Sequence, residues 1–251
     1  VVHFLKPASV THAANNQSGI PLARGSLAVF QGSGLADSEE NAPGRPLPLA
    51  LSGRELVVND LLPAPVSSMS PAQINFQVPS NAPLGIARLA VRVVETGELI
   101  AGSPVALATS SPGLFTTSED GRGQGRILNE DGTPNSASNA ALKGSTIKIF
   151  GTGQGPVSPP VPDGEEAPAE PAVNTVAVPT SDGQACLSRQ PSVCVAIGTT
   201  FGEIQFSGLA SGEVGMWLIT VKVPVNAPSG VVPLRALING APTNIVSVAI
   251  R

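Results

Sequence analysis

The sequence predicts an all-β protein built from two copies of an antiparallel β-sandwich, and three observations lead to this fold class. Glycine and proline contribute 27 and 25 of the 251 residues, and many short apolar runs lie between them. This composition favours strands and turns over helices. Apolar residues make up 41% of the chain, which is enough to form cores. Two sequence marks also occur twice in the same order, so we expect two copies of one folding unit.

The first mark is a Gly-Ser pair, an apolar run and a closing Gly-Ser/Thr-Gly, found at 25–34 and again at 144–153. The second is an alternating strand followed by Asn-Ala-Pro-x-Gly, found at 74–85 and again at 219–230. Alternation with a period of two predicts a strand that is packed on one face and solvated on the other. Proline and glycine then predict a turn that ends the strand.

The remaining elements follow from the same pattern. We expect strands near 26–31, 55–59, 74–78, 89–93, 104–109, 123–129, 145–150, 193–197, 203–207, 219–223, 231–238 and 243–250. Evidence for helices is nearly absent. The alanine-rich stretch 136–142 has the composition for one helical turn, but it is too short to be stable alone.

The domain boundary is expected near 110–113, which gives sandwich domains at 1–111 and 112–251 with a modest interface between them. The second domain carries an insertion at about 155–194. Its first part, 155–179, is rich in proline and contains the acids Asp163, Glu165, Glu166 and Glu170. We expect an extended, polyproline-like surface loop there.

Charge and hydropathy exclude some partners. Charged residues make up only 13% of the chain, the formal net charge is −4, and no basic patch is evident, which argues against nucleic acid. No apolar stretch approaches the roughly 20 residues that span a bilayer, so no membrane insertion is expected. Aromatic residues are scarce, which weakens the case for an aromatic sugar-binding platform.

Cys186 and Cys194 are the only cysteines, and seven residues separate them. Close, paired and otherwise solitary cysteines are typical of oxidising compartments, so a disulfide is the favoured interpretation. It would stabilise the domain by roughly 2–3 kcal/mol. The alternative is two unrelated reduced thiols. A metal site is poorly supported, because no histidine lies near them in the sequence.

Several stretches resemble an uncharacterised C-terminal domain family that is abundant in secreted proteins of Solibacter and other acidobacteria. They are VTHAA (10–14), ARGSLAVF (23–30), MSPAQINFQVP (69–79), SPGLF (111–115), LNEDGTPNS (128–136), GQGPVSPP (153–160) and FSGLA (206–210). The resemblance runs from about residue 9 to 251. It implies tandem immunoglobulin-like β-sandwiches on an exported bacterial protein. The family has no assigned activity, so the resemblance implies no catalytic residue.

Two loops carry weak signals for ligands. The glycine-rich run 151–155 follows a strand, but it lacks the Lys-Ser/Thr and the helix of a phosphate-binding loop. A turn at the end of the strand is the better interpretation. Residues 129–135 offer oxygen ligands, but they lack the spacing of an EF-hand. A β-turn through Asp-Gly is favoured there over a weak calcium site. We therefore expect no cofactor and no metal.

Few residues are candidates for catalysis. His3 and His12 are the only imidazoles, and neither lies beside a nucleophile motif such as Gly-x-Ser-x-Gly. His12 is expected at the surface or at a sheet edge. The acids cluster in the insertion, where a fixed carboxylate pair is hard to maintain. Trp217 is expected in the core or at the seam between the domains, rather than as a ligand platform.

The apolar opening Val1, Val2, His3, Phe4 and Leu5 lies outside the resemblance. One interpretation is a first strand that completes its own sandwich. The alternative is an inter-subunit strand that pairs with an open sheet edge of a neighbouring copy. Head-to-tail contacts of that kind propagate into a filament.

These observations favour a non-enzymatic structural or adhesive protein that is secreted or displayed on the bacterial cell surface. Its partner would be a protein, which includes further copies of itself, or a cell-surface glycan. A glycan-binding accessory module of a larger secreted protein is the alternative. A hydrolase is a third class, which broad substrate screening would reveal.

Overall fold

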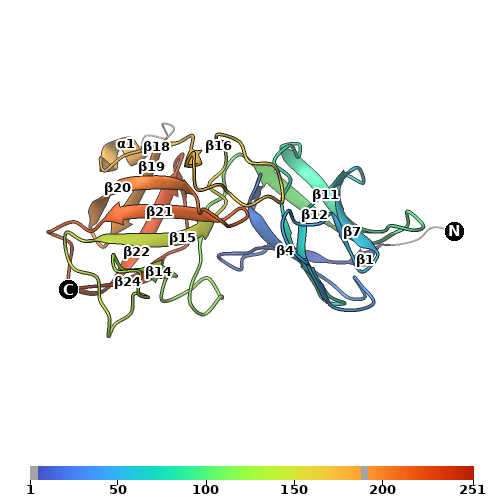
Figure 1. The fold of residues 1–251 in the computed structure, drawn as a ribbon, viewed down its shortest axis with the longest axis horizontal. Helices are drawn as coiled ribbons and strands as arrows, with labels where there is room; N and C mark the ends of the chain where they lie inside the picture. The colour runs from blue at the N-terminus through green and yellow to red at the C-terminus, as the bar shows by residue number, and fades with distance from the viewer. Residues whose placement is uncertain (1–4, 188–191) are drawn as a thin grey trace.

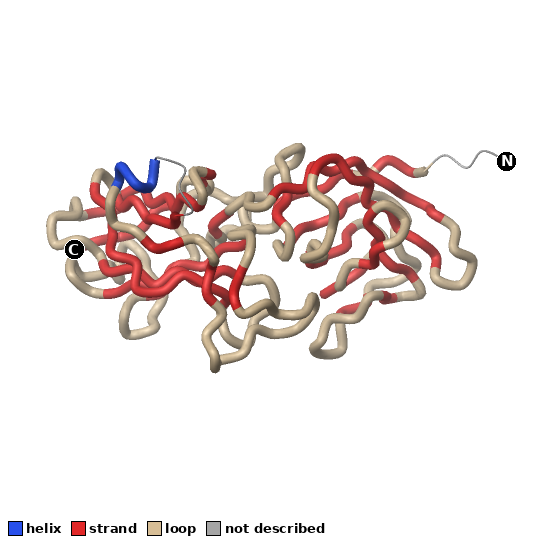
Figure 2. The backbone as a smooth tube through the Cα atoms, turned by 90° about the horizontal axis from the view of Figure 1, so that it is seen from above, coloured by secondary structure: helices blue, strands red, loops and turns tan. Residues whose placement is uncertain are grey.

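The computed structural model describes residues 5–187 and 192–251, which form two β-sandwich units placed end to end (Figure 1). Strands and loops make up nearly all of the chain, and the short helix α1 (Gly183–Leu187) lies at the edge of the second unit (Figure 2). No helix within the described residues combines the length and hydropathy needed to cross a membrane. The protein is therefore a tandem of immunoglobulin-like antiparallel sandwiches.

Two facing sheets make up the first unit. One follows the order β1 (Lys6–Pro7), β12 (Leu99–Ala108), β11 (Gly85–Val93), β7 (Arg54–Val58) and β6 (Ala50–Leu51), with β3 (Leu22–Ala23) on β12 and β8 (Leu62–Pro63) on β7. The other follows the order β2 (Ser9–His12), β4 (Leu27–Gln31), β10 (Gln73–Gln77), β9 (Val66–Met69) and β5 (Glu40–Asn41). Their inner faces share one core that includes Phe30, Phe76 and Leu89.

The second unit repeats this arrangement with additions. Its strand path is β13 (Gly113–Leu114), β15 (Thr146–Thr152), β21 (Trp217–Lys222), β20 (Thr200–Leu209), β19 (Ser192–Ile197), β22 (Gly230–Ile238) and β23 (Ala241–Pro242). Shorter strands pair beside this path, namely β14 (Ile127–Leu128), β16 (Val157–Ser158), β17 (Asn174–Thr175), β18 (Val178–Pro179) and β24 (Val246–Ile250). The long β20 pairs with β19 at its start and with β21 further on, across a register shift at 204–206. It thereby joins the two layers of this sandwich.

The duplicated sequence marks occupy equivalent places. Phe30 pairs with Ile74 in the first unit, and Ile149 pairs with Ile219 in the second. All four side chains are buried. The turns match as well, because Gly85 and Gly230 have φ angles of 99° and 100°. A positive φ is readily adopted by glycine and rarely by other residues. The repeat in the sequence is therefore a repeat of strand pairing, core and turn.

Two local expectations differ from the structure. Of the strand expected at 123–129, only Ile127–Leu128 pairs as β14, while Gln124 and Gly125 form isolated bridges to Ser247 and Thr116. The stretch 136–142 forms no helix. Ser136 and Asn139 close a turn there, and the Ala141 amide donates to Ala249 O at the edge of β24. Tertiary hydrogen bonds outweigh the weak helix propensity of so short a segment.

Candidate functional site

The sheets of the two units end on either side of residues 109–112, and buried polar groups join the units across the seam. Thr152 at the end of β15 is fully buried. Its Oγ1 accepts from the Leu27 amide of the first unit at 3.0 Å and donates to Gly215 O of the second at 2.8 Å. One hydroxyl therefore satisfies two backbone groups that would otherwise be buried without partners. The domain limits 1–111 and 112–251 stay a prediction.

His12 is fully buried at this junction, so the expectation of a surface position is wrong, although it lies on β2, the edge strand of its sheet, as the alternative expected. Its Nε2 donates to Ser111 O at 2.9 Å, and its Nδ1 accepts from the Ala14 amide at 3.2 Å. Burial removes water from the ring and lowers the pKa of His12 to about 4, against a smaller opposing effect of the Ser111 hydrogen bond. The ring is neutral near pH 7. It lies in the seam because β2 ends where the linker crosses.

The proline-rich insertion lies largely at the surface, as expected, but it also forms hydrogen bonds with the first unit. The Gly164 amide donates to Gln77 Oε1 at 2.7 Å, and Gly164 O accepts from the Leu47 amide at 2.8 Å. The Asp163 carboxylate accepts from the Ser80 amide at 2.9 Å and from its hydroxyl at 3.1 Å. The insertion therefore adds several hydrogen bonds between the two units.

The insertion also has a small core of its own. Ala167, Val173 and Leu209 are buried together, with Val157 and Val161 packed against them. The β16–β17 hairpin joins the second unit through a bridge from Asn174 to Gly208 on β20. This anchoring holds the segment in place, so that its far side can contact the first unit.

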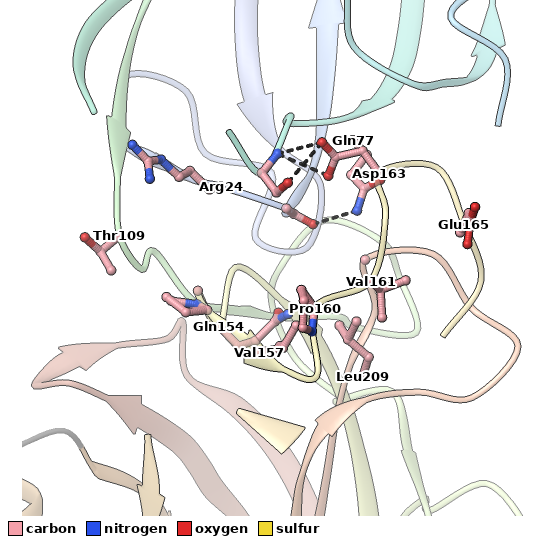
Figure 3. Close-up of a pocket in the computed structure, with 15 residues that line it drawn as sticks. Arg24, Gln77, Thr109, Gln154, Val157, Pro160, Val161, Asp163, Glu165 and Leu209 are labelled. Atoms are coloured by element: carbon pink, nitrogen blue, oxygen red, sulfur yellow. Dashed lines mark hydrogen bonds between the residues drawn. The ribbon is translucent and has the colours of Figure 1, made fainter. Parts of the chain in front are cut away.

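A cavity of about 290 Å³ lies between the insertion, the seam and the first unit (Figure 3). Arg24, Thr109 and Gln154 lie on one side of it in this view, and Asp163 and Glu165 lie on the other. Aliphatic side chains form much of the remaining wall, among them Val157, Pro160, Val161 and Leu209. The cavity thus combines a cationic side, an anionic side and an apolar surface.

Two of its polar side chains have no partner among the described residues. Gln154 is only 4% exposed, and its Oε1 is buried without a hydrogen bond. The Nε of Arg24 is likewise buried and unpaired. Buried polar groups in folded proteins are nearly always hydrogen-bonded, so two exceptions at one cavity require an explanation. We take this cavity, called here the junction pocket, as the candidate functional site.

The glycine-rich run 151–155 serves the junction. An added Cβ on Gly155 would approach Thr109 O at 2.5 Å, and one on Gly153 would overlap Ser111 O. Both glycines also have φ angles of 85°. Close approach of the linker therefore explains these glycines. A phosphate-binding loop requires a helix directly after the glycine-rich run, whereas the next element among the described residues is strand β16.

The loop at 129–135 uses its oxygens internally. Asp131 Oδ1 accepts from the amide and the hydroxyl of Thr133, which lowers the pKa of Asp131. Asn135 donates to Asn129 Oδ1 and to Ala249 O, both at 2.9 Å. The Gly132 amide closes the turn on Asn129 O at 2.9 Å. Within residues 5–187 and 192–251, no group of three or more His, Cys, Asp or Glu side chains is placed to bind a metal.

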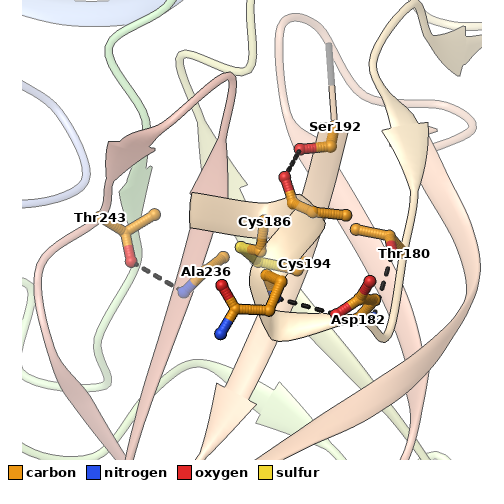
Figure 4. Close-up of a disulfide and its surroundings, with 9 residues drawn as sticks. Thr180, Asp182, Cys186, Ser192, Cys194, Ala236 and Thr243 are labelled. Atoms are coloured by element: carbon orange, nitrogen blue, oxygen red, sulfur yellow. Dashed lines mark hydrogen bonds between the residues drawn. A yellow bond between two sulfur atoms is a disulfide. The ribbon is translucent and has the colours of Figure 1, made fainter. Parts of the chain in front are cut away.

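Cys186 and Cys194 are joined by a disulfide between α1 and β19 (Figure 4). Both are buried with Leu237, and Phe201 packs beside them. Asp182 precedes the helix and accepts from the Gln184 amide at 2.9 Å. An acidic acceptor at this position is a common helix cap. The helix itself was not expected from the sequence.

The structure also locates Trp217 and Leu5, two further residues about which the sequence allowed a prediction. Trp217 is fully buried in the core of the second unit, and its Nε1 donates to Ser207 Oγ at 3.0 Å. Val1, Val2, His3 and Phe4 lie outside the described residues. Leu5 is half-buried, and the next residues, Lys6–Pro7, pair in parallel with 101–102 of β12 in the same unit.

Sequence reasoning did not identify Arg24, Gln154 or Gln77 as site residues. Arg24 directly precedes Gly25, and Gln154 lies between Gly153 and Gly155. A polar side chain next to a conformationally free glycine is the sequence signal that could have identified them. Gln77 stands where the second copy has Lys222. An amide can both donate and accept, and Gln77 does so by bonding Gly25 O and the Gly164 amide.

No protein-family model matches the chain, and a search of curated proteins finds no match. Among solved structures, it is similar to SGBP-B of a Bacteroides ovatus mixed-linkage glucan utilization locus, solved with a mixed-linkage heptasaccharide. The identity is 13% and the TM-score 0.36, over 92% of this chain and 42% of that one. It is also similar to the Escherichia coli adhesin FdeC, with 11% identity and a TM-score of 0.27, over 97% of this chain and 64% of that one.

Domains 5–6 of the S-layer protein SbsC give 11% identity and a TM-score of 0.27, over 98% of this chain and 97% of that one. The chain spans less than two thirds of the first two structures. Because every one of these TM-scores is below 0.5, they carry no inference about ligand or activity.

Proposed function

We propose that the chain is a rigid, non-enzymatic two-domain module of a secreted or cell-surface bacterial protein, with a structural or adhesive role. The observation that carries this proposal is the locked junction between units that lie end to end. Strand β1 lies toward one end of the long axis and β24 toward the other (Figure 1). Such a module fixes the distance and orientation between whatever is attached at its two ends.

The reactive groups near the junction support a role without catalysis. The ring nitrogens of His12 are engaged by Ser111 O and the Ala14 amide. The Ser111 hydroxyl donates to Pro21 O, so it is not oriented toward the imidazole as a nucleophile. Asp163 is engaged by Ser80. His12, Ser111 and Asp163 each already have a structural partner.

Export is supported by the disulfide, because such bonds persist in oxidising compartments. The bacterial origin rests on the sequence resemblance alone. A glycan-binding accessory module is the second candidate, and the acids Asp163 and Glu165 at the pocket favour it. However, no aromatic side chain among the described residues lines the junction pocket, so they provide no stacking surface of the kind common in sugar sites.

Residual dipolar couplings test the rigidity on which the proposal depends. We expect couplings from both units of the full chain to fit a single alignment tensor. The double variant Thr152→Val/Gln77→Leu removes the hydrogen-bonding groups at the seam and should require two tensors. The control Thr117→Val/Gln205→Leu makes the same changes at exposed positions. Two tensors in the unaltered protein would contradict the proposal.

Self-assembly by strand pairing between copies is a finer part of the proposal. Deletion of residues 1–8 should abolish any filament or oligomer formed by the full chain. Size-exclusion chromatography and negative-stain microscopy measure the outcome. If the full chain and the truncated chain are identical monomers, pairing through this segment is wrong, whereas the rigid-module proposal stands.

A further inference from the structure

The junction pocket has features that a purely structural seam does not need. Arg24 and Gln154 make no hydrogen bond or ion pair with any described residue, although both line a cavity between the units. Leaving such groups unpaired costs stability, and an apolar side chain of similar size would avoid that cost. We propose that this pocket binds the carboxylate of an extended peptide segment, with an aliphatic residue beside it. This goes beyond the proposed function, since a rigid spacer requires no ligand.

The donors define one end of the ligand. The buried unpaired atoms of Arg24 and Gln154 are Nε and Oε1, whereas the guanidinium nitrogens and the Gln154 Nε2 remain accessible. The accessible guanidinium and amide N–H groups match a carboxylate, which accepts hydrogen bonds at both oxygens, whereas the acceptor Gln154 Oε1 requires an N–H group of the ligand. Figure 3 places both side chains and Thr109 on the same side of the pocket. The ligand carboxylate belongs at this side.

The rest of the wall defines what lies beside the carboxylate. Val157, Pro160, Val161 and Leu209 present aliphatic surface without an aromatic ring. Glu165 on the far side is exposed and accepts hydrogen bonds from a backbone N–H or a cationic group. A peptide offers a carboxylate, an alkyl side chain and amide N–H groups in that order. A sugar ring would bring more hydroxyls into the pocket than its unpaired groups can satisfy.

The pocket is built from both units, which explains its place. Arg24 comes from the first unit, Gln154 from the strand end of the second, and Val157–Val161 from the insertion. A ligand seated there contacts all three parts. Binding therefore depends on the same junction that gives the module its rigidity, and it adds contacts across the seam.

Three tripeptides test the proposal by ¹⁵N NMR titration of the full chain. Acetyl-Ala-Val-Val with a free C-terminus and acetyl-Ala-Glu-Val-amide each carry a carboxylate, from a chain end and from a side chain respectively. Acetyl-Ala-Val-Val-amide carries none. We expect a carboxylate peptide to shift the signals of Gly25, Gly155 and Gly215, and the uncharged peptide to leave them unchanged. Whichever carboxylate peptide binds more tightly identifies the source of the carboxylate.

Two variants assign the effect to the unpaired groups. Arg24→Gln and Gln154→Met should each weaken peptide binding at least tenfold, whereas the exposed Arg122→Gln should not. Because Gln154 has no partner to lose, Gln154→Met should raise the melting temperature without ligand. A lower melting temperature would indicate a structural role for this side chain and would contradict the inference.

The remaining outcomes overturn the proposal. If neither carboxylate peptide shifts the pocket signals, the pocket does not recognise this chemistry. If sodium acetate binds as well as the peptides, the aliphatic wall contributes nothing and the ligand is not a peptide. If a glycan array gives hits that Arg24→Gln abolishes and the peptides do not bind, the pocket belongs to the glycan class. Each of these results leaves the dipolar-coupling test of rigidity unaffected.

Discussion

At the scale of single residues, His12 and Thr152 stabilise the junction by pairing backbone groups that no strand pairs. The sequence separation between His12 and Ser111 is 99 residues, and that between Leu27 and Thr152 is 125. Local sequence patterns therefore cannot predict either contact. Each also lies where water is excluded, so its loss leaves a buried donor or acceptor, which costs about 1–3 kcal/mol.

Burial of His12 predicts a pH dependence of stability. Its pKa falls from 6.5 to about 4 in the folded protein, so between these values the unfolded chain binds a proton that the native state does not. Stability is fully present above pH 6.5 and falls by about 3 kcal/mol as the pH drops to 4. Urea denaturation at several pH values should show this slope, and His12→Gln should lack it. Parallel curves for the two proteins would refute the effect.

Substitution of Gly153 by alanine is predicted to lower the free energy of unfolding markedly. The φ angle of this glycine is +85°, and an added Cβ would overlap Ser111 O. Gly212 has a φ of +75° with open space around the same position, so it isolates the backbone strain. We expect Gly212→Ala to cost about 1 kcal/mol. Gly153→Ala should cost at least about 1–2 kcal/mol more, because the linker must move. Equal unfolding free energies would mean that the linker adapts freely.

At the scale of elements, the insertion contains two segments that are held by different contacts. Residues 163–167 are held by the first unit through Gln77 and Ser80, and by the second through the Glu213 carbonyl. The segment from Thr180 to Leu187 is held by the disulfide and by the short parallel pairing of β18 with β19. The central strand β19 keeps its partners β20 and β22 without the bond.

Reduction of the disulfide should therefore loosen α1 alone. The expected decrease in the free energy of unfolding is about 2–3 kcal/mol for a loop of this length. Hydrogen exchange should rise at 180–187, remain unchanged at 163–167, and leave the first unit protected. The same reductant applied to Cys186→Ala/Cys194→Ala serves as the control and should have no effect. Equal loss of protection in both units would contradict this division.

At the scale of the whole molecule, the proposed rigidity depends on the contacts between the two sandwiches. The buried polar contacts, the hydrogen bonds between the insertion and the first unit, and the short linker would all restrict motion of one unit relative to the other. Domain pairs joined by small polar interfaces usually move relative to each other, so the proposed rigidity is a departure from the common case. The proposal assigns it to the insertion and the seam together.

Cooperative unfolding follows from this coupling. Differential scanning calorimetry of the full chain should give one transition, with the calorimetric and van't Hoff enthalpies equal. Thr152→Val/Gln77→Leu should split it into two, one for each unit. Thr117→Val/Gln205→Leu should retain the single transition. Two transitions in the unaltered protein would show that the units unfold independently.

Local pattern in the sequence determined the strands, the repeated pairing and the turns. Phe30 with Ile74, and Ile149 with Ile219, are buried as their alternation predicts, because a period of two places every second side chain on the core face. Gly85 and Gly230 close the same turn because both sequences carry the same proline and glycine. These features depend on neighbours a few residues away.

Only the tertiary structure decided where His12 and the insertion lie, and that Arg24 and Gln154 share a pocket. Gln77 meets Gly164 across 87 residues, and Ser80 meets Asp163 across 83. No periodicity encodes such contacts, because they depend on how two complete sandwiches pack against each other. The folding units are thus local properties of this chain, whereas its junction and its candidate site exist only once both units are folded.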